Sequence, residues 1–164
     1  MILDIRTFGD PVLREKCAPV TEIDDEVRRL AADMQETMYD ADGIGLAAPQ
    51  VGVPIRLFVY DVRQEGISPG VLVNPEIVEE EGAVKEEEGC LSIPGLSETV
   101  ERSESIVARG LGLDGEPVEI RADGILSRCI QHEKDHLDGI LFLDRVSPLK
   151  RKILLAKWRK QERD

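Results

Sequence analysis

The chain has 164 residues, of which 41% are hydrophobic, and this size and composition fit one soluble domain with one core. Its formal net charge of −12 argues against a protein whose whole surface binds nucleic acid. No stretch approaches the ~18 apolar residues of a membrane span, and the first residues lack the apolar run of a signal peptide. The odd number of cysteines favours reduced thiols over a disulfide framework. We therefore expect one cytoplasmic domain over residues 1–164, without membrane or DNA partners.

The N-terminal part of the chain predicts two helices. Asp10 can cap a short turn at residues 11–14, since a proline fits the first turn of a helix. Apolar residues recur at helical spacing from about residue 25 to residue 40, which predicts a longer helix. Gly43 and Gly45 then end the helical pattern, because glycine permits backbone angles that other residues resist.

The middle of the chain predicts short strands separated by glycine and proline. Their close succession suggests antiparallel hairpins. The acidic runs at 79–81 and 86–88 fit solvated charges of such hairpins, with Glu88 as an exception explained below. We expect strands at 55–62, 71–74, 76–78, 98–101, 106–109 and 117–122.

Two further helices follow the strands. Asp123 and Gly124 begin one at about residues 124–137, and a glycine at 139 ends it. Ser147 caps the last helix, which has a proline in its first turn and runs to the C-terminus.

Both histidines of the chain, His132 and His136, lie on the helix expected at 124–137. Side chains four residues apart share a helix face, about 6 Å apart along the axis, so two imidazoles can bind one metal ion at roughly 2.1 Å. Glu133 lies beside them, where a carboxylate can take a proton from a metal-activated water. Two surface histidines on an amphipathic helix are the alternative, but the pattern uses every histidine of the chain. We therefore predict a hydrolase with one metal ion.

The third metal ligand must be a cysteine, an aspartate or a glutamate, because no third histidine exists. This excludes the zinc proteases whose third histidine stands where this chain has Phe142. Cys129 precedes His136 on the same helix by a rise of roughly 10 Å, too far for both to bind one ion. Cys17 has no glycine or acidic cluster nearby. Cys90 follows a glycine that lets the backbone approach closely and is the best candidate, although spacing alone does not decide it.

Three stretches of the chain are Gly43-Ile44-Gly45-Leu46-Ala47-Ala48-Pro49-Gln50, Glu88-Gly89-Cys90-Leu91-Ser92 and Gln131-His132-Glu133-Lys134-Asp135-His136. In this order and at these intervals they resemble the three signature motifs of peptide deformylases. The resemblance implies an α+β fold, with antiparallel β-sheets packed around the central helix that carries the two histidines, plus an N-terminal and a C-terminal helix. It also implies removal of the formyl group from the N-terminal formyl-methionine of new bacterial proteins. Residues 9–14 and 36–39 extend the likeness over nearly the whole chain.

The resemblance implies that Cys90, His132 and His136 hold one divalent ion. Fe²⁺ is the family's usual native metal, although Zn²⁺, Ni²⁺ or Co²⁺ can occupy the site. Two imidazoles and a thiolate suit several of these ions, so the sequence alone does not choose among them.

The catalytic roles implied by the resemblance agree with the chemistry of the residues. Metal-bound hydroxide attacks the formyl carbon, and Glu133 accepts the proton of the water and passes it to the leaving amine. The backbone N–H of Leu91 and the side-chain amide of Gln50 stabilise the oxyanion. Alternatively, Gln50 only caps a turn and does not contact the oxyanion.

Substrate-binding residues also follow from the resemblance. The glycines of residues 43–45 let an extended peptide lie alongside as an added strand, and Gly89 lets the backbone of its loop approach closely. Ile44 and Ile125 could equally be plain core residues. The methionine pocket is expected near Ile44, Glu88, Ile125, Cys129 and His132.

The chain departs from the family at two places. Members often carry an arginine near residues 95–97, where this chain reads Gly-Leu-Ser. Position 128 is arginine, where some relatives have an apolar residue that lines the pocket. Contacts beyond the methionine can therefore differ in this chain.

The last predicted helix is basic. Residues 148–164 carry seven positive and two negative side chains, and asymmetry of this kind often marks an interaction element. The helix could simply pack on the body with a solvated basic face, or it could dock on the ribosome by contacting RNA phosphates, as in some relatives.

Two other functions are weighed against deformylation. A minimal metallopeptidase would cleave internal peptide bonds. A catalytically idle, metal-stabilised ribosome-binding module would have no use for Glu133 and Gln50, because structural metal sites are closed by four ligands.

Overall fold

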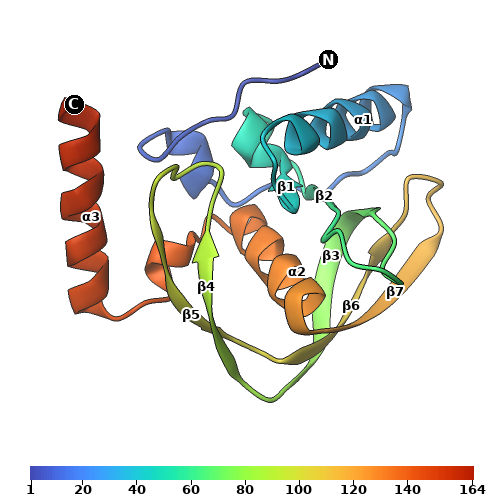
Figure 1. Cartoon of the computed structure of the whole chain (residues 1–164). Helices are drawn as coiled ribbons and strands as arrows, with labels where there is room; N and C mark the ends of the chain where they lie inside the picture. Colours follow the sequence, from blue (N-terminus) through green and yellow to red (C-terminus); the bar gives the residue numbers. More distant parts are fainter.

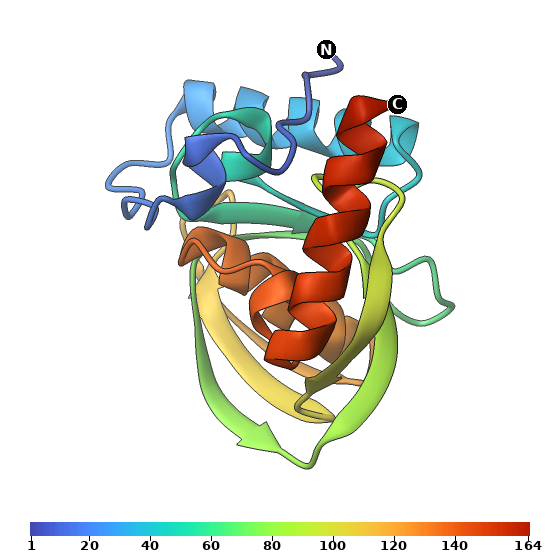
Figure 2. The same cartoon turned by 90° about the vertical axis from the view of Figure 1, so that its left-hand side faces the viewer.

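A computed structural model describes all of residues 1–164. Two antiparallel sheets flank one central helix, α2, while α1 and α3 lie outside this arrangement (Figures 1 and 2). The predicted α+β class with antiparallel sheets is confirmed. No helix combines the length and apolar character needed to cross a membrane. The helices are α1 (Asp25–Asp40), α2 (Gly124–Leu137) and α3 (Pro148–Arg163), with the 3₁₀ helices η1 (Pro11–Arg14), η2 (Ala48–Val51) and η3 (Phe142–Asp144).

The larger sheet has the strand order β1-β2-β3-β6-β7, and the smaller one pairs β4 with β5. Only Gly82 and Ala83 separate β3 from β4, so the chain passes from one sheet to the other at this turn (Figure 1). Gly82 has a φ of 72°, a backbone angle that favours glycine. The strands are β1 (Gly45–Ala47), β2 (Leu57–Tyr60), β3 (Gly70–Glu81), β4 (Val84–Gly89), β5 (Ser97–Arg102), β6 (Ser105–Leu111) and β7 (Pro117–Asp123).

The helices begin and end where the sequence predicts. The Asp24 side chain accepts a hydrogen bond from the Val27 N–H at the start of α1, and Ser147 caps α3. Asp123 also occupies the N-cap position of α2, but its side chain does not bond to the helix. Its carboxylate accepts a hydrogen bond from the Ser105 hydroxyl instead, which joins α2 to β6.

The strand predictions need three corrections. The expected strands at 71–74 and 76–78 are one strand, β3, with a bulge between Val73 and Glu76. Asn74 has a φ of 50° there, and the proline that follows has no N–H for the ladder. The strand expected at 55–62 is shorter, and β1 and β4 were not predicted as strands.

The apolar face of α2 lies in the core. Ile130 and Leu137 are fully buried against Phe58 and Leu72 of the larger sheet. Burying side chains of this size contributes ~1.5–3 kcal/mol each, so the face opposite the histidines holds α2 in place. A separate cluster, which contains Trp158, attaches α3 to the loop before β5.

Candidate metal centre and substrate cleft

Three side-chain atoms of the type that binds metals converge at one point. The Nε2 atoms of His132 and His136 are 3.2 Å apart, and the Sγ of Cys90 is 3.4 Å from the Nε2 of His136. All three atoms lie within 4.8 Å of one another. The histidines come from α2, whereas Cys90 comes from the loop that follows β4. Two imidazole nitrogens and a sulfur aimed at one point fit a divalent transition-metal ion.

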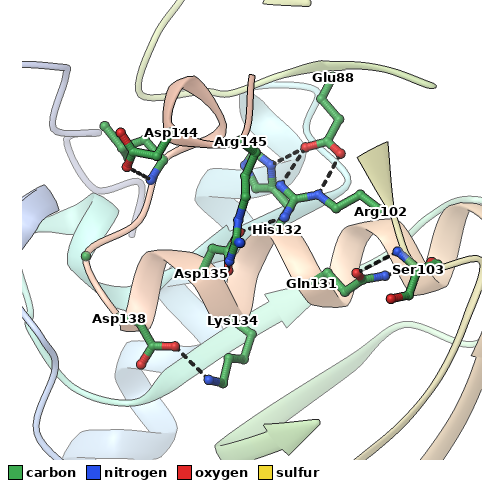
Figure 3. Close-up of polar contacts among 12 residues, drawn as sticks. Glu88, Arg102, Ser103, Gln131, His132, Lys134, Asp135, Asp138, Asp144 and Arg145 are labelled. Carbon is green, nitrogen blue, oxygen red and sulfur yellow. Dashed lines mark hydrogen bonds and ion pairs between the residues drawn. The ribbon is translucent and has the colours of Figure 1, made fainter. Parts of the chain in front are cut away.

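A carboxylate fixes the orientation of one of these imidazoles. The Nδ1 of His132 lies 2.9 Å from Oε1 of Glu88, so an Nδ1–H that donates to Glu88 leaves Nε2 free to accept (Figure 3). The Arg102 guanidinium donates to both Glu88 oxygens, each over 2.9 Å. Burial alone would raise the pKa of Glu88, but the hydrogen bonds from Arg102 and His132 outweigh it and lower that pKa to about 2.

The ion-pair network continues from Arg102 to the segment before α3. Arg102 also donates to Asp135 over 2.6 Å, and Arg145 donates to both oxygens of the same carboxylate (Figure 3). Arg102 and Asp135 are buried, so each buried charge has an opposite charge in contact. Sequence reasoning assigned no role to Arg102 or Arg145, because neither lies in a motif. Asp135 did lie in one.

Glu133 is buried beside the three converging atoms. Its side chain has no hydrogen-bond partner at Oε1, and burial raises its pKa to about 7. The carboxylate packs directly on the backbone of Gly45, where a Cβ would come within 2.6 Å of Oε2. Glycine at position 45 therefore makes room for this carboxylate.

The loop after β4 also approaches Gln50. The buried amide of Gln50 accepts a hydrogen bond from the Ala47 N–H at Oε1, which points its Nε2 towards the loop. That Nε2 donates to the Ser92 hydroxyl over 3.0 Å and lies 3.6 Å from the Sγ of Cys90. The backbone N–H of Leu91 takes part in none of the backbone hydrogen bonds of this loop. The Leu91 N–H is therefore free to donate towards a ligand in the cleft, and the Gln50 Nε2 can do so in exchange for its long hydrogen bond to the Cys90 sulfur.

A cleft of about 430 Å³ opens onto these groups. The structure brings together every residue that the sequence suggested for substrate binding, and places Gln50, Cys90, Leu91, His132 and Glu133 in the same cleft. Arg128 lies there as well, although it was not among the expected binding residues. The suggested residues are Gly43, Ile44, Gly45, Glu88, Gly89, Ile125 and Cys129.

The other two cysteines lie away from the convergence point. Cys129 lines the cleft and its Sγ is 3.6 Å from the Ile44 carbonyl oxygen, but it is not one of the three converging atoms. Cys17 belongs to the core, where burial raises the pKa of its thiol to about 11. Neither placement is that of a metal ligand.

Comparisons with known proteins agree with this geometry. The sequence model of the family described as polypeptide deformylase matches residues 2–152. Peptide deformylase from Alkalilimnicola ehrlichii is 57% identical over 160 residues, which cover 97% of this chain and 90% of that protein. The crystal structure of a peptide deformylase from Legionella pneumophila has a TM-score of 0.93 and 45% identity, and covers 99% of this chain and 96% of that one.

A third similar structure holds a peptide. Peptide deformylase from Acinetobacter baumannii, solved with Met-Ala-Ser bound, has a TM-score of 0.85 and 36% identity, and covers 89% of this chain and 99% of that one. The match to the family spans nearly the whole of this chain, and Gln50, Cys90 and Glu133, one from each motif, line the same cleft. The chain therefore belongs to the peptide deformylase family of metalloenzymes, which remove N-formyl groups from nascent peptides.

Proposed function

We propose that this chain, as one domain over residues 1–164, removes the formyl group from the N-terminal formyl-methionine of new proteins in the bacterial cytoplasm. The observation that carries the proposal is the convergence of the Cys90, His132 and His136 ligand atoms beside the unpartnered oxygen of Glu133. The relative bound to Met-Ala-Ser supports the same substrate class, because this tripeptide is what deformylation of formyl-Met-Ala-Ser leaves.

One divalent ion is proposed to bind to Cys90, His132 and His136. This ion is Fe²⁺, the usual native metal of the family, and Zn²⁺, Ni²⁺ or Co²⁺ can replace it. Only three protein atoms converge, which suits a catalytic site with an open position rather than a closed structural one. When bound, the ion supplies Lewis acidity, which polarises a carbonyl oxygen and lowers the pKa of water.

Glu133 is the proposed proton carrier. Its free Oε1 can accept the proton of the water that attacks the formyl carbon, and can then deliver this proton to the amine nitrogen that leaves. Its contact with Gly45 limits where the carboxylate can move. Proton transfer by a positioned carboxylate of this kind contributes about 10²–10⁴-fold to the rate.

Gln50 and Leu91 are the proposed donors to the formyl oxygen. Negative charge develops on this oxygen during attack, and donors already in place stabilise it without reorganisation. The Gln50 amide is held at its Oε1 by the Ala47 N–H, so its Nε2 keeps a fixed direction. The Leu91 N–H has no competing backbone partner.

The peptide is proposed to bind in extended form along β1. This strand is at the edge of the larger sheet and pairs only with β2, so its other side is available to an added strand. Ile44 precedes it, while Gly89 and Glu88 form part of the facing wall of the cleft. The methionine side chain then enters between Ile125 and Cys129 of α2.

One assay separates deformylation from its alternatives. Metal-loaded enzyme is incubated with formyl-Met-Ala-Ser and, separately, with unformylated casein, while new amines, formate and peptide fragments are measured. Formate with one new amine per tripeptide, and intact casein, is the expected result. Cleaved casein would indicate a metallopeptidase, and no turnover of either substrate would indicate an idle binding module. Both of these results contradict the proposal.

The basic helix α3 is proposed to contact the ribosome. It packs on the body through Leu154 and Trp158, while the side chains of Leu149 and Ile153 are exposed together with its lysines and arginines. Figure 1 shows this helix at one side of the molecule, and in Figure 2, which is turned towards that side, it lies in front of the other elements. A solvated basic face remains the alternative, and the charge test in the Discussion separates the two.

A further inference from the structure

One positive charge in the substrate cleft has no partner in the protein. Arg128 lines the cleft and is half-buried, yet it forms neither an ion pair nor a hydrogen bond with any other residue. A half-buried guanidinium offers five N–H donors in a fixed geometry that matches a carboxylate. Its lack of a partner therefore points to a ligand rather than to a structural role.

None of the acidic side chains of the same cleft pairs with Arg128. Asp42 forms an ion pair with Arg63 at 2.6 Å, and Glu87 accepts a hydrogen bond from the Ser97 hydroxyl over 2.6 Å. Glu88 is held by Arg102, and Glu133 belongs to the reacting centre. Arg128 is the one arginine or lysine of the cleft, and it is therefore left without an acidic partner in the protein.

The position of Arg128 indicates which part of a peptide it would meet. It lies on α2 one turn before His132, about 6 Å along the helix axis from that ligand. In an extended peptide the first and third side chains point to the same side, about 7 Å apart. If the methionine side chain enters the cleft beside Ile125, the third side chain also faces α2, within reach of a long arginine.

We propose that Arg128 is a specificity-determining residue that binds an acidic side chain at the third position of the formylated peptide, with formyl-methionine as the first. This inference rests on the proposed deformylase function. The net charge of −12 repels acidic peptides at long range, so a preference for them requires a local cation. Residues 89–101, on the facing wall and just beyond it, contain no lysine or arginine that could serve instead.

The test compares kcat/KM for formyl-Met-Ala-Glu-amide and formyl-Met-Ala-Gln-amide, since the amide removes the terminal carboxylate. The wild type should prefer glutamate by about three- to tenfold, a preference that shrinks in high salt. Arg128→Met should abolish or reverse the preference, and Arg128→Lys should keep part of it. Arg121→Met removes an equivalent charge from an exposed site on β7 and should keep the wild-type ratio.

Two further measurements identify the peptide position that Arg128 contacts and test whether the preference arises from binding. Formyl-Met-Glu-Ala-amide and its glutamine counterpart should show no such preference, because the second side chain points away. Calorimetric binding of Met-Ala-Glu-amide and Met-Ala-Gln-amide should show the same ratio without turnover. Equal wild-type rates for the first pair, a ratio unchanged in Arg128→Met, or a preference at the second position would overturn the inference. Loss of formyl-Met-Ala-Ser turnover would instead overturn the proposed function.

Discussion

The imidazole of His132 and the carboxylate of Glu88 lie 2.9 Å apart between Nδ1 and Oε1. This contact fixes the ring so that its Nε2 faces the Cys90 sulfur and the second histidine. Arg102 holds Glu88 from β5, and Asp135 holds Arg102 from α2. The direction of one ligand nitrogen therefore depends on side chains from both strands of the smaller sheet as well as from its own helix.

Arg102→Met should destabilise the protein and loosen the metal. The substitution leaves Glu88 and Asp135 without their shared buried cation, a loss that typically costs about 3–5 kcal/mol. Because Glu88 also orients His132, metal affinity should fall by about 10–100-fold. Urea unfolding and metal release to a chelator measure the two effects.

Arg145→Met is the matched control for this change. Its side chain is 44% exposed and contacts only Asp135 within the network, so its loss should cost well under half as much stability. If the two substitutions had equal effects on stability and on metal affinity, the contact of Arg102 with Glu88 would not be what orients His132.

Glu133→Ala should keep the metal and lose turnover. The carboxylate is not among the three converging atoms, so metal content should stay near one ion per chain. Without the proton carrier, kcat should fall by about 10²–10⁴-fold. Metal analysis and a formate assay on the same sample measure both. Loss of metal together with activity would mean that Glu133 is a ligand.

Gly45→Ala should lower activity by displacing Glu133. The added Cβ would come within 2.6 Å of Oε2 and 3.0 Å of the Cys129 sulfur, so the carboxylate must move. A misplacement of about 1 Å in a catalytic group can cost about 10²-fold in rate. Gly112→Ala is the control, since its Cβ would come close only to the flexible end of the Asp114 side chain and would meet Val118 at an ordinary 3.5 Å. Wild-type kcat in Gly45→Ala would show that the contact does not position Glu133.

The ion pair between Arg14 and Asp144 should make the stability of the fold depend on pH. Burial alone would raise the pKa of Asp144, but hydrogen bonds from Arg14 and from the Leu141 N–H outweigh it and lower that pKa below its ordinary 3.8. A carboxyl with a lowered folded-state pKa stabilises the protein above the unfolded value, and this stabilisation is lost as pH falls through the folded one.

Asp144→Asn should therefore be less stable than the wild type by about 1 kcal/mol at pH 7, and the difference should shrink as pH drops below about 4. Thermal unfolding of both proteins from pH 7 to pH 3 measures this. Glu65→Gln, at an exposed site, should show no comparable difference at any pH. A constant gap between Asp144→Asn and the wild type would rule out the charged pair as the cause.

Removing charge from α3 should weaken sedimentation with ribosomes. Lys152 and Lys160 are exposed and form no ion pair, so their replacement by glutamine leaves the folded body unchanged. Each lost phosphate contact should reduce the slope of log affinity against log salt by about 1. Lys85→Gln with Arg121→Gln removes equal charge elsewhere and serves as the control. If the two double variants sedimented identically with ribosomes, the basic face of α3 would be solvated and would not contact the ribosome.

Local signals in the sequence predicted the helices well. Asp24 and Ser147 cap α1 and α3 where hydrogen-bonding side chains precede an apolar period, and α2 ends before Asp138-Gly139 as expected. These signals lie within a few residues of what they determine. The spacing of His132 and His136 likewise follows from helical geometry alone.

Features that depend on distant parts of the chain were not predictable from the sequence. Strand β1 has only three residues and exists because β2 pairs with it, and β4 is an acidic strand that depends on β5. Arg102 forms ion pairs with Glu88, which is 14 positions away in the sequence, and with Asp135, which is 33 positions away. No periodic pattern in the sequence indicates contacts at such separations. The sequence also could not show that Arg128 lines the cleft without an acidic partner, because this depends on where the cleft's acidic side chains lie.

The three converging atoms come from two different layers of the molecule, since the histidines belong to α2 and the sulfur follows β4. An ion bound there cross-links the smaller sheet to the central helix as a disulfide would, but reversibly. Stripping the ion should therefore loosen the β4–β5 hairpin, which Arg102 and Glu88 still tether to α2, and faster amide hydrogen exchange confined to that hairpin would report it. In this enzyme, chelation would loosen one wall of the cleft as well as remove the metal.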